Sequence, residues 1–148
     1  MEMSLEQLSK LDEGMNLPEI KKSVIQENIN LYAEASRDFN PIHIDEEFAS
    51  KSPLGGTIAH GMLILAYVSQ VMTAAFGQSW LVAGKLNIRF KAPVKPGDTI
   101  MVSGKIRRIT ESERRTLVDC DVLCRNQDGE AVITGEAKVE MKSQENNS

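Results

Sequence analysis

Between residues 58 and 76 the chain reads IAHGMLILAYVSQVMTAAF, without one charged side chain. Apolar or small residues surround most of this segment at helical spacing, and Gly77 follows it as a C-terminal cap. A helix that is apolar nearly all round has to be buried nearly all round, so the segment predicts a central helix whose core includes Met62 and Met72. Polar residues interrupt the stretch too often for a membrane span, which needs about 20 predominantly apolar residues.

Runs of alternating apolar and polar residues follow this helix, with no further helix between them. Turn sequences separate the runs at Pro96-Gly97-Asp98 and at residues 126–129. Alternation of this kind predicts strands with one buried face and one wet face. The predicted strands cover residues 82–90, 100–109, 118–124 and 131–139.

The expected fold class is therefore α+β, with an antiparallel sheet wrapped around the long central helix. A shorter helix is predicted upstream over residues 26–37, ending before Pro41 because a proline disfavours helical geometry in the residue before it. An alternative is two packed layers with the long helix at a dimer interface. No repeat or linker divides the 148 residues, so we expect one domain over residues 1–148, with its core at about 23–141.

The charge and the cysteines restrict the function classes. The net charge of −4, from 17 basic and 21 acidic residues, argues against nucleic-acid binding, which needs a basic face. Cys120 and Cys124 lie on one predicted strand, roughly 13 Å apart, too far for a disulfide. With no signal sequence visible at the start, a reducing, cytoplasmic location without membrane insertion is expected. Two histidines without a cysteine cluster predict no metal site.

The segment DFNPIH, residues 38–43, offers an acid/base pair. The turn-forming Asn40 and Pro41 reverse the chain, so that the carboxylate of Asp38 and the imidazole of His43 can converge. Such a pair is usual equipment for general acid/base catalysis near neutral pH. The competing interpretation is that Asp38 caps a turn and His43 is an ordinary core histidine.

A second segment, GGTIAHGM at residues 55–62, opens the long helix. Glycines let a ligand approach the backbone closely, and helix N-termini present unpaired N–H groups. Gly61 can therefore donate its N–H to a developing oxyanion. The competing interpretation is a glycine loop needed only for packing, with His60 bonded to a backbone carbonyl. Ser69, farther along the helix, by itself indicates only a bond to a preceding carbonyl.

Together with RFKAPVKPGD at residues 89–98, these two segments resemble the MaoC-like (R)-specific enoyl-CoA hydratases and 3-hydroxyacyl thioester dehydratases of the hot-dog fold. The resemblance runs from about Ser23 to Met141. It implies a long helix wrapped by an antiparallel sheet, and a homodimer, or a dimer of dimers, in which sheets join edge to edge. Where many relatives have Thr before the first helix, this chain has Ile25, and a helix cap worth about 1 kcal/mol is lost.

The resemblance also assigns roles to individual positions. Asp38 and His43 match the pair that binds the reacting water, and Asn40 matches the residue that orders their loop. Gly61 matches the glycine whose N–H polarises the thioester carbonyl, beside His60. Ser69 matches a helix serine near the catalytic water in some members.

The implied activity is reversible addition of water to a trans-2-enoyl thioester in fatty acid metabolism, with acyl-CoA or an acyl carrier protein thioester as substrate and no cofactor. Two other classes stay open. A hot-dog thioesterase would hydrolyse the same thioester, and an acyl-CoA-binding subunit would need no Asp38/His43 pair.

Overall fold

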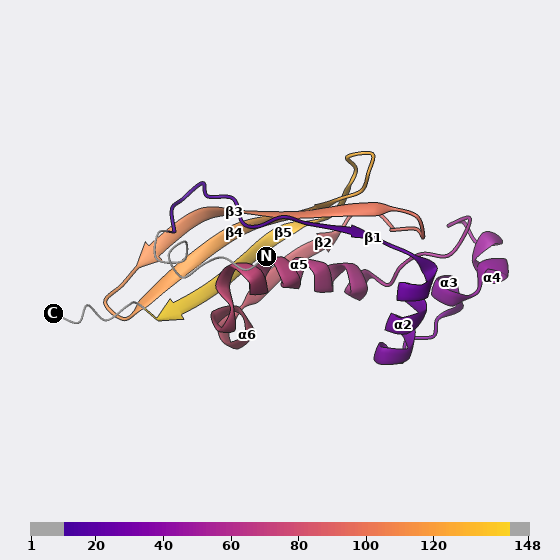
Figure 1. Cartoon of the computed structure of the whole chain (residues 1–148), viewed down its shortest axis with the longest axis horizontal. Helices are drawn as coiled ribbons and strands as arrows, with labels where there is room; N and C mark the ends of the chain where they lie inside the picture. Colours follow the sequence, from indigo (N-terminus) through magenta and orange to yellow (C-terminus); the bar gives the residue numbers. More distant parts are fainter. Residues whose placement is uncertain (1–10, 143–148) are drawn as a thin grey trace.

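The computed structural model describes residues 11–142 as one sheet with helices packed on one side and at one end (Figure 1). Along the chain the elements are β1 (Ile20–Ser23), α2 (Gln26–Ser36), α3 (Pro41–Ile44), α4 (Glu46–Ser50), α5 (Gly61–Phe76), α6 (Gln78–Ala83), β2 (Lys85–Phe90), β3 (Thr99–Glu111), β4 (Arg115–Arg125) and β5 (Ala131–Lys142). The predicted α+β class is confirmed. Residues 1–10 and 143–148 of the expected domain lie outside the described residues.

All neighbouring strands of the sheet run antiparallel, in the order β1-β3-β4-β5-β2. The period of two predicted from the sequence is clearest in β4, where every second side chain is buried: Val118, Cys120, Val122 and Cys124. A register shift between Ile106 and Arg108 marks a bulge in β3. Since the buried side chains all point to one face, that face forms half of the core.

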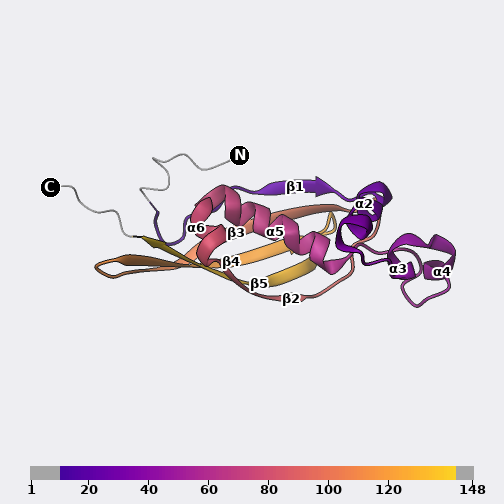
Figure 2. The ribbon, with the colours of Figure 1, turned by 90° about the horizontal axis from the view of Figure 1, so that it is seen from below.

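Helix α5 lies across this inner face of the sheet (Figure 2). Its core-facing side chains are Leu63, Ile64, Val68, Val71, Met72, Ala75 and Phe76. Burying one large apolar side chain stabilises a fold by roughly 1.5–3 kcal/mol, so this stripe is a major part of the stability. The arrangement is the one implied by the hot-dog resemblance, a long helix against an antiparallel sheet.

The start and the exposure of the long helix differ from the prediction. Residues 58–60 are not helical: Ala59 donates its N–H to Val94 O at 2.7 Å, His60 is extended, and the helix begins only at Gly61. The prediction that the long helix is buried nearly all round is wrong for the single chain. Its exposed residues form a stripe: Gly61, Met62, Ala66 and Gln70. Met62 is 58% exposed and does not belong to the core.

The strand predicted from residue 82 begins three residues later, at Lys85. Residues 78–83 form helix α6 instead, after Gly77 at φ 55°. Leu81 and Val82 are 71% and 77% exposed, so their apolar character reflects no burial within this chain. Alternation over a few residues cannot separate a short helix from a strand end when the apolar residues lie outside the core.

Residues 26–60 form a lobe at one end of the sheet, made of α2, α3 and α4 and the extended segment after them (Figure 1). Helix α2 was predicted almost to the residue, and Ile25 before it supplies no side-chain cap, as expected. The short helices α3 and α4 and the edge strand β1 were not predicted. Each is too short for a periodic pattern to be recognised.

Candidate active site

The lobe brings together two of the predicted site residues and a third from the segment before α5. Asp38, His43 and His60 each offer one ligand atom, and these atoms lie within 4.8 Å of one another. The carboxylate and the imidazole of the DFNPIH segment therefore converge as the turn at Asn40-Pro41 predicts.

His43 lies in α3, which begins where the Asn40 side chain accepts the Ile42 N–H at 3.2 Å. The His43 side chain is buried, and its Nδ1 lies 2.8 Å from the carbonyl oxygen of Ile58. A carbonyl oxygen only accepts hydrogen bonds, so Nδ1 of the neutral ring carries the proton and Nε2 keeps its lone pair. His43 is thus held in the tautomer that can accept a proton at Nε2.

His60 is held in the opposite tautomer. Its Nε2 lies 3.0 Å from the carbonyl oxygen of Asp38 and must donate to it. The ring stacks on His43 with centroids 3.9 Å apart and meets the Tyr32 ring at 4.8 Å. Its Nδ1 is buried and has no hydrogen-bond partner among residues 11–142. His60 therefore links the two members of the pair, through a backbone bond to one and a ring contact to the other.

The Asp38 side chain is exposed, and its Oδ1 accepts the Asn40 N–H at 3.2 Å. The turn-capping interpretation of Asp38 is thus also correct, and it uses one carboxylate oxygen only. Arg37, directly before it, has φ 63°, and among the described residues it is the one non-glycine with positive φ. Such strained backbone clusters at functional sites, where the surrounding structure maintains it.

Gly61 is the first residue of α5, where an N–H has no acceptor within the helix. A Cβ at this position would lie 3.0 Å from Cε1 of Phe90, so the ring of Phe90 packs directly over the glycine. Beside them is a cavity of about 310 Å³ with a mainly apolar lining: Ile58, Ala59, Gly61, Ile64, Phe90, Lys91, Ala92, Pro93, Val94 and Val132. Gly61 therefore borders a half-open, mainly apolar cavity. Phe90 is not among the predicted site residues, because its place in a strand pattern carries no sign of this contact.

Within this chain the Ser69 side chain contacts α6. It lies eight residues after Gly61, roughly 12 Å along the helix axis, and its Oγ accepts the indole N–H of Trp80 at 2.9 Å. Its hydroxyl therefore joins α5 to α6.

The two thiols on β4 are free and buried, as expected without a disulfide. Burial raises the pKa of the Cys120 thiol to about 12 and that of Cys124 to about 11. Both remain protonated near neutral pH, and neither provides a thiolate nucleophile.

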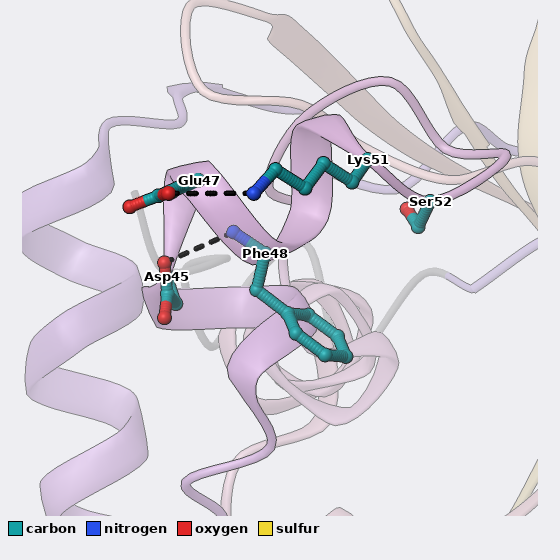
Figure 3. Close-up of a pocket in the computed structure, with 5 residues that line it drawn as sticks. All are labelled: Asp45, Glu47, Phe48, Lys51 and Ser52. Atoms are coloured by element: carbon teal, nitrogen blue, oxygen red, sulfur yellow. Dashed lines mark hydrogen bonds and ion pairs between the residues drawn. The ribbon is translucent and has the colours of Figure 1, made fainter.

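A hollow of about 420 Å³ lies on α4, lined by Asp45, Glu47, Phe48, Lys51 and Ser52 (Figure 3). Asp45 accepts the Phe48 N–H at 3.1 Å and so caps α4, and Lys51 pairs with Glu47 at 3.4 Å. Both charged partners are largely exposed, and such pairs contribute less than about 1 kcal/mol. None of the three clustered residues lines this hollow, so we assign it to the framework of the lobe.

The cluster of Asp38, His43 and His60 has the residue types of a metal site, with two imidazoles and a carboxylate. One nitrogen of each ring already donates to a carbonyl, which leaves His43 Nε2, His60 Nδ1 and the carboxylate as ligand atoms. The chemistry predicted for the pair uses the carboxylate and His43 Nε2 without an ion.

The MaoC-like domain model matches residues 9–127. The chain belongs to the MaoC-like domain family. A 3-hydroxybutyryl-CoA dehydratase from Methylorubrum extorquens is 33% identical over 126 residues, which cover 85% of this chain and 78% of that protein. An (R)-specific enoyl-CoA hydratase from Rhodospirillum rubrum is 30% identical and covers 81% of each protein. These relatives are hydro-lyases, as the sequence predicted.

Solved structures agree with the fold. The R-hydratase PhaJ1 from Pseudomonas aeruginosa superposes with a TM-score of 0.76 at 27% identity, covering 93% of this chain and 89% of that one. An (R)-hydratase from A. caviae involved in PHA biosynthesis gives a TM-score of 0.75 at 26% identity, covering 87% of this chain and 96% of that one. Within residues 11–142, no helix has the length and apolar character that crossing a lipid bilayer requires.

Proposed function

We propose that this MaoC-like protein is an (R)-specific enoyl-CoA hydratase and (R)-3-hydroxyacyl-CoA dehydratase that uses Asp38 and His43 as its acid/base pair. The observation that carries the proposal is their convergence within 4.8 Å, with the lone pair of His43 Nε2 left unused. The Gly61 N–H and the apolar cavity beside Phe90 supply an oxyanion donor and space for an acyl chain.

The reacting water bridges the pair in the proposed complex. The Asp38 carboxylate and His43 Nε2 are both acceptors, so a water between them donates one proton to each and turns its oxygen lone pair outward. In hydration this oxygen attacks C3 of the enoyl group, and the pair takes up a proton from the water. The pair then delivers that proton to C2, so that the elements of water are added across the double bond and both groups return to their starting protonation. The two groups act as a unit in these proton transfers.

Gly61 polarises the substrate. Its N–H donates a hydrogen bond to the thioester carbonyl, whose oxygen becomes more negative as C3 is attacked. Donors aimed at developing charge are often the largest single contribution to catalysis. His60 supports the pair through the Asp38 carbonyl, and Asn40 supports it by capping α3. Dehydration follows the same path in reverse, and no redox cofactor or metal is needed for it.

Crotonyl-CoA tests the activity and separates the open classes. Loss of enoyl absorbance without release of free thiol is expected for a hydratase. Release of free thiol would indicate a thioesterase, and binding without either change would indicate an acyl-CoA-binding subunit. The same assay with crotonyl-acyl carrier protein compares the two carriers.

We further propose a homodimer. Edge strand β2 pairs only with β5 within the described residues and leaves its other backbone edge open. The exposed stripe on α5 and the exposed Leu81 and Val82 on α6 add apolar surface that a second copy would cover. Sedimentation at micromolar concentration should show a dimer or a dimer of dimers, and a monomer alone would contradict this assembly. The protonated buried thiols fit a reducing location such as the cytoplasm.

A further inference from the structure

Thr57 lies at the centre of a hydrogen-bonded group that surrounds His43 but does not contain the reacting atoms. Its side chain is 3% exposed. Its hydroxyl lies 2.7 Å from Gln26 Oε1 and 3.1 Å from Glu46 Oε2, and its backbone N–H donates to the same Glu46 oxygen at 3.1 Å. Gln26 Nε2 in turn donates to the carbonyl oxygen of His43 at 2.8 Å.

The direction of these bonds follows from the number of available protons. The His43 carbonyl can only accept, so the NH₂ end of the Gln26 amide must face it and the Oε1 end must face Thr57. The Thr57 hydroxyl has one proton, and the nearer acceptor at 2.7 Å is Gln26 Oε1. Glu46 then accepts the Thr57 backbone N–H. The side chain of Gln26 thus has one orientation, which its bonds to the His43 carbonyl at one end and to the Thr57 hydroxyl at the other determine together.

Two of the contacts that hold His43 lead to Thr57, in addition to its N–H bond to the Asn40 carbonyl and its stacking on His60. The backbone carbonyl of His43 is held by Gln26, whose amide is oriented by the Thr57 hydroxyl. Its ring is held by the carbonyl of Ile58, the residue that follows Thr57 in the chain. Ile58 also donates its N–H to Ile42 O at 3.1 Å. The group therefore fixes the position of the Ile58 carbonyl, which accepts the hydrogen bond of the His43 ring, relative to the backbone of His43.

We propose that Thr57 and Gln26 are positioning residues for the hydratase reaction, which hold His43 in the Nδ1–H tautomer with its Nε2 lone pair directed at the reacting water. This inference rests on the proposed function for its catalytic consequence. Its structural consequence, a single tautomer of His43, can be measured without any substrate.

Packing alone does not require a hydroxyl at position 57. Valine has the same branched shape as threonine and would fill the same space. A buried hydroxyl is unfavourable unless it is hydrogen-bonded, and here its one proton goes to Gln26, whose amide leads to His43. The orientation of His43 therefore explains the threonine at position 57 better than the stability of the fold does.

Two variants distinguish the effect of the Thr57 hydroxyl from the effect of its side-chain shape. Thr57→Val removes the hydroxyl, and Thr57→Ser keeps it. Loss of one orienting hydrogen bond should lower kcat for crotonyl-CoA hydration about 10-fold in Thr57→Val, with KM within about 2-fold of wild type. Thr57→Ser should recover most of the lost kcat. Thr73→Val is the control, because the Thr73 hydroxyl donates to the Ser69 carbonyl at 3.0 Å on α5, away from the lobe, and it should leave kcat unchanged.

The tautomer is read by ¹⁵N NMR of protein labelled at histidine. The chain contains only two histidines, and the structure holds them in opposite tautomers, so each ring can be assigned by one substitution. In wild type, His43 should show a protonated Nδ1 and His60 a protonated Nε2. In Thr57→Val, His43 should shift toward a mixture of tautomers while His60 changes less.

The outcomes separate this inference from the proposed function. Unchanged kcat and unchanged His43 tautomer in folded Thr57→Val overturn the inference, as does an equal loss of kcat in Thr57→Val and Thr57→Ser. A fall in kcat without a tautomer change also overturns it, because the effect then bypasses His43. If Thr57→Val does not fold, Gln26→Met replaces it, and unfolding of both would make the group part of the framework and overturn a positioning role. A wild type that does not hydrate crotonyl-CoA overturns the proposed function, while the NMR experiment still tests the tautomer.

Discussion

The lobe and the body of the molecule, which comprises α5 and the sheet, are held together by different interactions. The body buries apolar side chains between α5 and the strands, and its backbone groups are paired in regular ladders. The buried polar side chains among residues 11–142 are His43, Thr57 and His60, and all of them lie in the lobe. The lobe depends on individual hydrogen bonds with specific partners, because a buried polar group without a partner is costly.

Because of this difference, the body mainly provides stability and the lobe mainly orients the site residues. Apolar packing is tolerant of direction, so the body can be stable without defining the orientation of any one group. Hydrogen bonds are directional, so the lobe can orient an imidazole and a carboxylate toward one point. Substitutions in the lobe are therefore expected to change activity more than stability, and substitutions in the body the reverse.

The largest effect is expected from the pair in the lobe. Asp38→Asn keeps the shape and removes the proton-accepting charge, and His43→Gln keeps hydrogen bonding and removes titration. Each should lower hydration of a short enoyl-CoA by about 10²–10⁴, the usual range for positioned acid/base groups. The double variant should be little worse than either single one, because groups that act as a unit are not additive. The melting temperature should barely change in Asp38→Asn, because the amide keeps the Oδ1 acceptor, and should fall in His43→Gln, because the imidazole is buried and stacked on His60. A folded single variant with most of its activity would remove the pair from the mechanism.

A similar loss is expected where the lobe meets the body, at Gly61. Gly61→Val should lower turnover by about 10²–10³, the usual cost of losing one oxyanion donor, because the side chain crowds the bound carbonyl. The introduced side chain also meets the Phe90 ring, 3.0 Å from the added Cβ. Gly61→Val combined with Phe90→Ala relieves that contact and should remain as slow as Gly61→Val. Recovery of turnover in the double variant would assign the loss to the Phe90 clash.

The body should respond in stability instead. Ile106, fully buried on β3, leaves a cavity when replaced by alanine, and Ile106→Ala should lower the free energy of unfolding by about 2–5 kcal/mol. Turnover measured well below the melting temperature should stay close to wild type. Arg108→Ala, two residues along the same strand and exposed, is the control and should change stability by less than about 0.5 kcal/mol. A loss of turnover in folded Ile106→Ala would show that the body also orients the site.

Alkaline pH should weaken the body through its thiols. The pKa of Cys120 is raised to about 12, by burial first and then by the neighbouring Asp119 and Asp121 carboxylates, and burial raises that of Cys124 to about 11, from an ordinary 9.0. The folded state therefore binds more protons than the unfolded state between these values. The contribution to stability is complete below pH 9 and is lost as pH rises toward 11–12, by about 1.4 kcal/mol per pH unit and thiol. Urea unfolding across pH 8–11 measures it, and a Cys120→Ala/Cys124→Ala variant should show a shallower decline. Parallel curves would contradict the assignment.

The parts of the molecule that could be predicted from sequence are those governed by local patterns. Alternation in β4 identified its buried face, and the absence of charge identified α5 as the core helix. Helix α6 could not be predicted, because Leu81 and Val82 are apolar yet exposed. The contact of Phe90 with Gly61 joins β2 to the start of α5, and no local pattern reports such a contact.

For the site, the sequence by itself determined the residue types and their convergence. A carboxylate and an imidazole on either side of an Asn-Pro turn can approach each other regardless of the structure around them. Only the tertiary structure decided which nitrogen of each imidazole carries the proton. His43 donates to a carbonyl 15 residues away and His60 to one 22 residues away. These distant backbone acceptors, and no feature of the motif, leave the lone pair of His43 on Nε2, because a carbonyl oxygen accepts hydrogen bonds and never donates them.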